Sequence, residues 1–315
     1  MDILMNVDDD FLLSLGRKGG SQQTDLSFVQ RIIEQTKVQQ SYIATGGSCS
    51  NTIKGLCNLG HSCAFFGKLG KDEMGTQYLN SIRSIGIVPL CIHSNHQTQV
   101  CMCLISNDGE RTMRCYPGAA NEIESHELNP SLFKGVNLVH IEGYMLYAKD
   151  KNFVPEAMRC AKEAGATISF DLSSYDLIRL QKEKIIEILN NYVDIVFANE
   201  DEVKELTGQE PLEGCAVLKQ ICPIAVVMVG PKGCIVGSGE MLHHSSAFPV
   251  KAIDTTGAGD LFASGFLHAY LNGLPLKVCA LIGNMVGGAV CEVYGAEIPK
   301  QKWNSLKMQL GCFQQ

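Results

Sequence analysis

From residue 137 onward, short apolar runs alternate with longer runs that have helical spacing. The alternation predicts strands at 138–141, 167–171, 194–198 and 225–229, and helices at 155–164, 177–189 and 200–206. It is typical of a parallel sheet covered by helices on both faces. In such sheets, ligands bind at the carboxyl ends of the strands. The sequence therefore predicts an α/β fold with a doubly wound, mostly parallel sheet and a site at that edge.

Residues 254–260 read Asp-Thr-Thr-Gly-Ala-Gly-Asp and precede an apolar, helix-prone run over 261–271. Val250 and Ile253 indicate that an extended segment ends just before, so the glycines fall where a strand becomes a helix. The first N–H groups of a helix are unpaired and partly positive, so such a turn can hold an anion. A lone Gly-Ala-Gly would be an ordinary capped turn, but two threonines and two acids exceed what a cap requires. We therefore expect Asp260 in the first helical turn, beside a bound phosphate.

This segment resembles the DTxGAGD signature of the ribokinase-like sugar and nucleoside kinases, the PfkB family. Further motifs appear in the order of that family: a Gly-Gly turn at 46–47 with Asn51, an Asn-x-x-Glu motif at 199–202 and a glycine turn at 230–233. The resemblance spans nearly the whole chain. Within the family, the chain is most similar to the bacterial adenosine kinase-like branch. The resemblance implies a single ribokinase-like domain over residues 1–315, with a small β-sheet lid formed by about 8–45 and 87–117.

A phosphoryl transfer site needs donors for the phosphate, a cation and a base on the acceptor hydroxyl. The candidate anion hole is the backbone of Gly257, Ala258 and Gly259. Asp260 is the candidate base, which orients the acceptor and takes its proton late.

The resemblance also implies acceptor contacts. Gly47 and Asn51 match residues that contact substrate hydroxyls, and Asp2 matches an aspartate that binds sugar hydroxyls. Considered alone, the Gly-Gly turn fits a tight helix start with a serine N-cap. Arg114 could close over the phosphate from the lid, or it could simply solvate an exposed hairpin.

For the nucleotide and its cation, Asn199 and Glu202 match the family motif that influences Mg²⁺ through water, although acids also favour first helical turns for dipole reasons alone. Gly230, Lys232 and Gly233 are expected to receive ATP phosphates, with Met228 where the family has Thr or Ser. Asn284 is expected in the adenine or ribose pocket, or else facing a neighbouring helix. Asp254 and Thr256 match ligands of a monovalent cation such as K⁺.

The segment 100–116 predicts a hairpin whose turn is Asn107-Asp108-Gly109-Glu110. Both faces of the run 100–105 are apolar. The hairpin is therefore expected to be covered on two sides by ligand, by the main domain or by another subunit, which leaves a monomer or a homodimer through the lid open.

The first predicted strand, 3–7, starts almost at Met1, whereas a buried strand usually has about five residues. The resemblance implies a strand that precedes Asp2, and that strand is missing here. If Met1 is the true start, the first strand and one wall of the substrate site are expected to be compromised. A start placed too late is the simpler explanation.

Composition limits the partners. The net charge is -7 and Lys and Arg form no run longer than a pair, which argues against nucleic acid or an acidic membrane as the main partner. The uncharged stretch 278–291 is too short to span a bilayer. The fourteen cysteines of this long chain are interpreted as reduced core thiols, and we expect a soluble, cytoplasmic protein.

These observations predict an ATP- and Mg²⁺-dependent kinase that phosphorylates a primary hydroxyl of a small sugar or nucleoside, with an adenosine-like acceptor ahead of others. The alternatives are a ribokinase- or fructokinase-type sugar kinase and a non-catalytic nucleoside-binding protein on the same fold. No GxxxxGK[ST] or GxGxxG motif supports a P-loop NTPase or a dinucleotide oxidoreductase.

Overall fold

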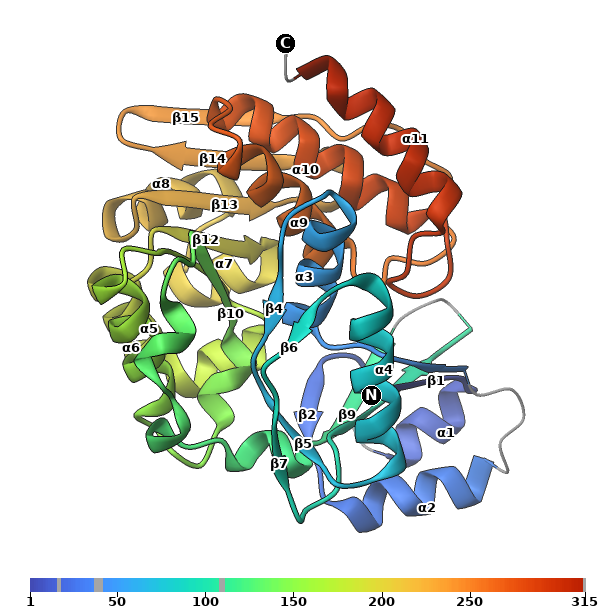
Figure 1. Cartoon of the computed structure of the whole chain (residues 1–315). Coiled ribbons are helices and arrows are strands. Elements are labelled where there is room, and N and C mark those ends of the chain that lie inside the picture. Colours follow the sequence, from blue (N-terminus) through green and yellow to red (C-terminus); the bar gives the residue numbers. More distant parts are fainter. Residues whose placement is uncertain (16–17, 37–41, 108–110, 314–315) are drawn as a thin grey trace. The chain divides into compact units, whose positions relative to one another are not determined.

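The computed structural model describes residues 1–15, 18–36, 42–107 and 111–313 (Figure 1). The chain forms two compact units. The first unit comprises Met1–Gly47, Ala64–Ile123 and Tyr147–Asp150, and the second comprises Ser48–Cys63, Glu124–Leu146 and Lys151–Gln315. Both predicted lid segments fall within the first unit.

The second unit contains a six-stranded sheet in the order β10-β11-β12-β13-β14-β15. Its strands are β10 (Leu138–Glu142), β11 (Thr167–Asp171), β12 (Ile195–Asn199), β13 (Ile224–Met228), β14 (Cys234–Ser238) and β15 (Met241–Ser245). The first four strands are parallel, and β14 and β15 add antiparallel pairs. This confirms the predicted mostly parallel sheet and brings the carboxyl ends of β10 to β13 to one edge.

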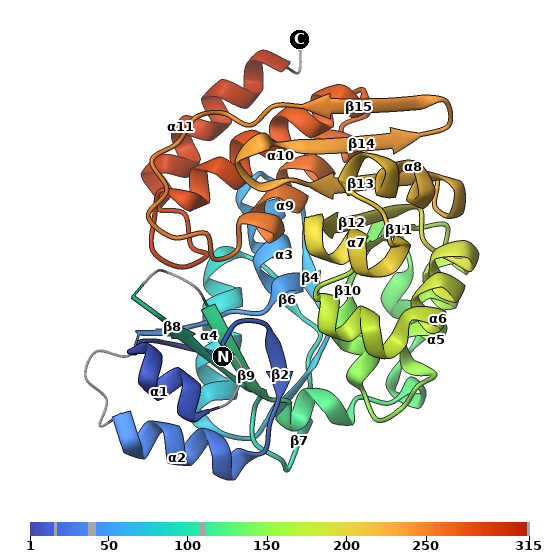
Figure 2. The same cartoon turned by 180° about the vertical axis from the view of Figure 1, so that it is seen from behind.

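Helices cover both faces of this sheet (Figures 1 and 2). One face packs against α5 (Phe153–Glu163), α6 (Tyr175–Asn191), α7 (Glu200–Thr207) and α8 (Pro211–Ile221). The other face packs in one apolar core with α3 (Ser48–Asn58), α9 (Ala258–Leu271), α10 (Leu276–Cys291) and α11 (Lys300–Leu310). When neighbouring parallel strands follow one another in sequence, right-handed crossovers place the connecting helices on one face. The helices outside these crossovers, α3, α9, α10 and α11, cover the other face.

Aromatic side chains bind α9 to the sheet. Phe197 of β12 lies edge-on to Phe266, with ring centroids 5.5 Å apart, and Phe262 stacks on Phe266 at 6.3 Å. Each such pair contributes about 0.5–1.5 kcal/mol beyond the area it buries. Phe262 also lies edge-on to Phe197, at 6.4 Å, so the first half of α9 is held against β12.

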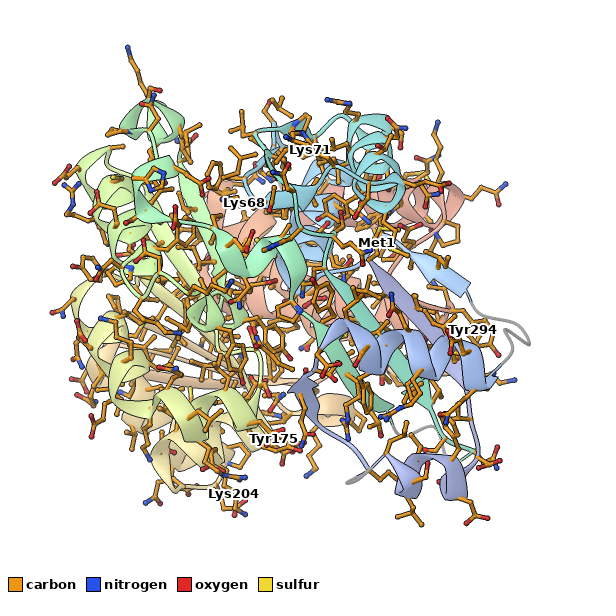
Figure 3. All side chains as sticks on the ribbon, turned by 90° about the horizontal axis from the view of Figure 1, so that it is seen from below. Met1, Lys68, Lys71, Tyr175, Lys204 and Tyr294 are labelled. Atoms are coloured by element: carbon orange, nitrogen blue, oxygen red, sulfur yellow. A yellow bond between two sulfur atoms is a disulfide. The ribbon has the colours of Figure 1, made fainter. Side chains whose placement is uncertain are left out.

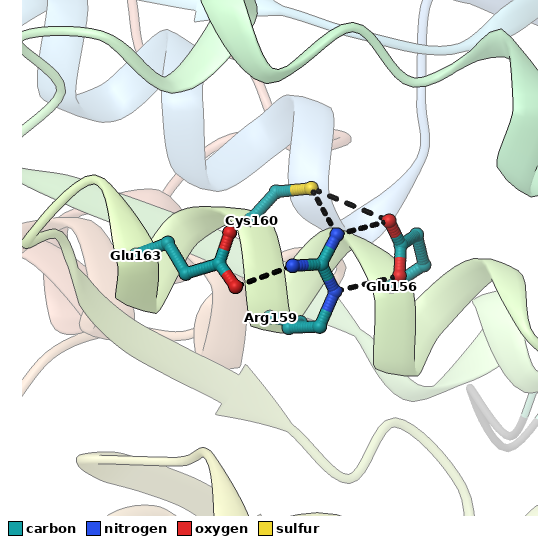
Figure 4. A network of polar contacts seen from close by, with 4 residues as sticks. All are labelled: Glu156, Arg159, Cys160 and Glu163. Carbon is teal, nitrogen blue, oxygen red and sulfur yellow. Dashed lines mark hydrogen bonds and ion pairs between the residues drawn. The ribbon is translucent and has the colours of Figure 1, made fainter.

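The outer surface of the second unit carries ion pairs. On α5, Arg159 donates to Glu156 at 2.6 and 2.9 Å and also pairs with Glu163, while the Cys160 thiol contacts Glu156 (Figure 4). Lys204, labelled in Figure 3, lies in the last turn of α7. It pairs with Glu210 at 2.6 Å. These pairs are exposed, so they contribute little to stability.

The first unit contains a five-stranded sheet in the order β2-β9-β8-β1-β3. Its elements are β1 (Asp2–Asn6), β2 (Ser21–Gln23), β3 (Tyr42–Ala44), β8 (Val100–Ile105), β9 (Arg111–Tyr116), α1 (Asp9–Ser14) and α2 (Leu26–Thr36). The unit also has α4 (Glu73–Ile85) and the short parallel pairs β4 (Ala64–Phe65) with β6 (Val88–Pro89) and β5 (Lys68–Gly70) with β7 (Ile92–Ser94). Strand β1 has five residues and pairs with both β8 and β3. The strand predicted at 3–7 is therefore present and begins one residue earlier than predicted.

The two faces of this sheet differ. Ile3 and Met102 lie on the face that packs against Leu12 of α1 and Ile32 of α2. The other face carries Asp2 in one row with Cys101. Both faces of β8 are buried, as predicted for this hairpin. Residues 108–110 of the predicted turn lie outside the described residues.

Cys101 and Cys115 are joined by a disulfide. They lie directly opposite one another in the antiparallel register of β8 and β9, with their Cα atoms 4.0 Å apart. The expectation that all the cysteines are reduced was wrong for this pair, because that register is not visible in the sequence.

The segment before α9 also differs from expectation. It is not a strand, and the last strand before it, β15, ends at Ser245. Val250 and Ile253 are 38% and 52% exposed, and the Ile253 N–H donates to the Cys291 carbonyl and not to a neighbouring strand. The glycine turn therefore follows an irregular loop.

No helix in the described ranges combines the length and the apolar character that crossing a bilayer requires.

Candidate functional site

Asp260 lies in the first turn of α9 and is held by side chains of α3. The Ser48 hydroxyl donates to Asp260 Oδ1 at 2.7 Å, and Asn51 Nδ2 donates to Oδ2 at 2.8 Å. The Thr52 hydroxyl donates to the backbone carbonyl of Asp260 at 3.1 Å. Both carboxylate oxygens are thus oriented by neutral donors, which leaves the carboxylate able to act as a base.

Asn51 also has a side-chain oxygen that accepts no hydrogen bond within the described chain. Its side chain is 5% exposed, and its Oδ1 has no hydrogen-bond partner among the described residues. A buried carbonyl oxygen without a donor is costly. This oxygen is therefore suited to accept a hydrogen bond from a hydroxyl group of a bound molecule.

The N-terminus of α9 is open. Gly257 stands at the N-cap with φ 74°, and no side chain caps this helix in the part of the chain described. The Ala258 N–H donates to the Thr255 carbonyl at 3.2 Å, whereas the described chain offers no acceptor to the N–H groups of Gly257 and Gly259. An added Cβ on Gly257 would come within 2.5 Å of Ala296 Cβ, so the turn requires glycine. This geometry suits an anion at the helix start.

Met228, at the end of β13, lies beside this turn. Its Cε would be 3.4 Å from a Cβ added to Gly259. The residue that departs from the family pattern thus packs next to the candidate anion hole and supplies no hydrogen bond there.

Two acids that the sequence reasoning missed lie at the same sheet edge. Glu142 ends β10 and Asp171 ends β11, and they are adjacent in the register. Burial, the charge of Asp260 and that of Glu142 raise the pKa of Asp171 to about 7. The sequence contains an indication of both acids, because each one directly follows an apolar run that predicts a strand. The carboxyl ends of these strands form the predicted binding edge.

Asn199 and Glu202 form a capping box at the start of α7. Asn199 Oδ1 accepts from the Glu202 N–H at 2.9 Å, and the Asn199 N–H and Nδ2 donate to the two oxygens of Glu202, each at 2.8 Å. Burial, followed by the charge of Asp171, raises the pKa of Glu202. Within the described ranges, no group of three or more His, Cys, Asp or Glu side chains could by itself hold a metal ion. Because both Glu202 oxygens already accept hydrogen bonds, the pair fits Mg²⁺ held through water and not by direct ligation.

The Asp254 carboxylate accepts hydrogen bonds from its own turn and from a later loop. Its Oδ1 accepts from the N–H and the hydroxyl of Thr256 at 2.8 and 2.7 Å, and its Oδ2 accepts from the Gly295 N–H at 2.8 Å. These contacts tie the turn to the loop between α10 and α11. A role for Asp254 and Thr256 with a monovalent cation stays a prediction.

The expected nucleotide contacts lie on two elements. Gly230 and Lys232 are in a 3₁₀ turn after β13, followed by Gly233, and Lys232 is exposed. Asn284 of α10 is buried and donates to the carbonyls of Ser245 and Ser246 at 3.0 and 3.3 Å. Its amide therefore holds the end of β15, and its contact with a nucleotide stays a prediction.

The remaining expected residues belong to the first unit. A Cβ on Gly46 would lie 1.6 Å from Asp2 Oδ2, so the Asp2 carboxylate rests directly on the Gly46 backbone, and Gly47 follows with φ 102°. Arg114 is only 3% exposed and lies beside Met102, on the face opposite to Asp2. The structure brings Asp2 to the Gly-Gly turn and Asn51 to Asp260, but it does not bring Arg114 to Asp2.

Known proteins are similar to this chain in sequence and in fold. Residues 20–303 match the family described as pfkB family carbohydrate kinase. The solved adenosine kinase of Sinorhizobium meliloti is 29% identical, with a TM-score of 0.91 over 98% of this chain and 96% of that one. A probable sugar kinase of Rhizobium etli CFN 42 is 28% identical, with a TM-score of 0.92 over 98% and 95% of the two chains. Fructokinase-1 of Zea mays is 32% identical over 71% of this chain and 73% of its own length.

Proposed function

The chain belongs to the pfkB family of carbohydrate kinases, and we propose that it transfers the γ-phosphate of ATP to a primary hydroxyl of a small sugar or nucleoside. The observation that carries this proposal is the Asp260 carboxylate, held at 2.7 and 2.8 Å by Ser48 and Asn51 beside an uncapped helix N-terminus. The proposed base and the proposed anion site therefore belong to one helical turn.

In the proposed reaction, Asp260 accepts a hydrogen bond from the acceptor hydroxyl and orients its oxygen toward the phosphorus. Because phosphoryl transition states are loose, the proton moves to Asp260 late. The N–H groups of Gly257 and Gly259 stabilise charge on the transferring phosphate, since fixed donors need no reorganisation during the reaction.

Mg²⁺ supplies positive charge that offsets the nucleotide phosphates when it is bound. Asn199 and Glu202 are the residues that would hold its water ligands. Gly230, Lys232, Gly233 and Asn284 are the proposed nucleotide contacts, and Asp254 with Thr256 would serve K⁺.

The proposed acceptor is a ribonucleoside of the adenosine type. The similarity to the Sinorhizobium meliloti adenosine kinase extends over 98% of the chain. Asp2, Gly47 and Asn51 are the proposed hydroxyl contacts. A fructokinase-type reaction is the second candidate, because Fructokinase-1 of Zea mays has the higher identity, 32%.

The test is ADP release with ATP and Mg²⁺ across a panel of nucleosides and sugars. We expect turnover with adenosine or a close relative, and mass spectrometry of the product should place the phosphate on the primary hydroxyl. Turnover with fructose alone would establish the second candidate. No ADP release with any acceptor would contradict the kinase proposal.

A further inference from the structure

We propose that Glu142 is a positioning residue that sets the place of Asp260 by anchoring the start of helix α3, an inference that rests on the proposed function. Glu142 is the last residue of β10, and its Oε2 accepts from the Cys49 N–H at 2.6 Å. Cys49 is the second residue of α3, where N–H groups have no partner within the helix. A carboxylate there is a charge-assisted acceptor and also favours the helix dipole.

Helix α3 has no local side chain at its N-cap position. The helix begins at Ser48, so the N-cap position belongs to Gly47, which has no side chain to accept an N–H of the first turn. The Ser48 hydroxyl donates to Asp260. Glu142 therefore supplies from β10 the acceptor that Gly47 cannot supply.

A second contact ties the same residue to the same strand. The Cys49 thiol donates to the His140 carbonyl at 3.3 Å. Glu142 and His140 are both in β10, so this strand holds Cys49 through its backbone and its side chain. Ser48 and Asn51, one residue before and two residues after Cys49, bind the two oxygens of Asp260. The path from β10 to Asp260 therefore runs through a single helical turn.

Glu142 also contributes charge to its surroundings. The acids that share this edge are Asp171 on β11, Asp260 on α9 and Glu202 on α7. Burial and the charges of Glu142, Asp260 and Asp171 raise the pKa of the Cys49 thiol. A glutamine at 142 keeps an oxygen acceptor but removes the charge, whereas an alanine removes both, so the two variants separate positioning from electrostatics.

The first measurement is steady-state kinetics of Glu142→Ala and Glu142→Gln over a range of pH. We expect Glu142→Ala to lower kcat by about 10–100-fold, since small misplacement of a catalytic group costs up to that much. We expect Glu142→Gln to keep kcat within about threefold at pH 8 and to shift the acid limb of the pH profile to lower pH, because losing a neighbouring negative charge favours ionised acids. Wild-type kcat and pH profile in both variants would overturn the proposal.

The matched control is Asp194→Asn. Asp194 likewise accepts a backbone N–H in the same sheet, that of Ile168 at 2.7 Å, but at the opposite, amino edge of the strands. We expect this variant to change stability and to leave kcat and its pH profile unaltered. An equal change of both in Asp194→Asn would mean that Glu142 acts only through general stability, and the proposal would fail.

The second measurement does not depend on turnover. The alkylation rate of Cys49 by iodoacetamide, followed by peptide mass spectrometry against pH, should rise at pH 8 in Glu142→Gln because the thiol ionises more easily. If the wild-type chain phosphorylates no acceptor while this rate rises, the proposed function fails and the contact of Glu142 with α3 stands. An unchanged Cys49 rate together with equal kcat loss in both Glu142 variants would overturn the positioning role.

Discussion

Helices α7 and α9 both begin with acids in their first turn, but their N-termini are built differently. At α7, Asn199 and Glu202 satisfy one another in a closed capping box. At α9, Gly257 in the left-handed region leaves the first N–H groups without a side-chain cap in the described chain. The closed end stabilises the helix, whereas the open end gives up that stability and keeps donors for an anion.

The largest expected effect comes from the acid of the open end. Asp260→Asn should lower kcat by about 10²–10⁴-fold, the usual contribution of a positioned general base. The matched control is Asp201→Asn, an exposed acid in the first turn of α7, which should leave kcat unchanged. ADP release with the accepted substrate measures both variants, and substantial turnover by Asp260→Asn would contradict the assigned mechanism.

Two glycines with equal backbone angles separate conformational strain from anion binding. Gly257 has φ 74° with Ala296 in the way of a side chain, while Gly208, which ends α7, has φ 73° with nothing within 4 Å. Gly257→Ala should lower kcat by about 10²-fold through the displaced donors. Gly208→Ala should cost about 1 kcal/mol of stability and no activity. Equal kcat losses in the two variants would refute an anion hole at α9.

Asp171 links the two helix ends, because Asp260 raises its pKa and it in turn raises that of Glu202. Its folded pKa of about 7 lies above its unfolded value. Its contribution to stability is therefore fully present below about pH 4 and is lost as the pH rises to 7. Asp171→Asn removes this dependence, so between those pH values the variant should gain about 4 kcal/mol of unfolding free energy relative to wild type.

Urea unfolding of Asp171→Asn and wild type at several pH values measures that gain. A constant difference in the free energy of unfolding between pH 4 and 8 would show that Asp171 does not titrate with a raised pKa.

The smallest effect is expected at the closed end. Asn199→Ala removes the N-cap of α7 and should cost about 1 kcal/mol of unfolding free energy. If Asn199 also serves the cation, the Mg²⁺ concentration for half-maximal activity should rise in the same variant. Lost stability without any change in Mg²⁺ dependence would make the Asn-x-x-Glu motif purely structural here.

Local sequence patterns predicted the strands and helices well, but they did not predict which side chains meet in the fold. Strands β10 to β13 were predictable because apolar runs of strand length are local information. Glu142 and Asp171 were missed because their proximity depends on strand order. The sequence does not separate a capping box from a cation motif at Asn199 and Glu202, since both interpretations need the same two residues, and the cation role stays a proposal.

Register explains the other differences. The Cys101–Cys115 pair and the burial of Arg114 beside Met102 depend on how β8 aligns with β9, which the alternating apolar residues do not specify. Val250 and Ile253 predict an extended segment before α9 because they are β-branched. In the structure this segment is an irregular loop, and both side chains are exposed.

The disulfide between β8 and β9 distinguishes the two units in the unfolded chain as well. It links residues 14 apart, and the cysteines of the second unit keep their thiols. Closing a loop of about that length removes roughly 3 kcal/mol of unfolded-state entropy. A thiol reductant should therefore lower the melting temperature of the first unit while leaving the second unit, which carries Asp260, unchanged.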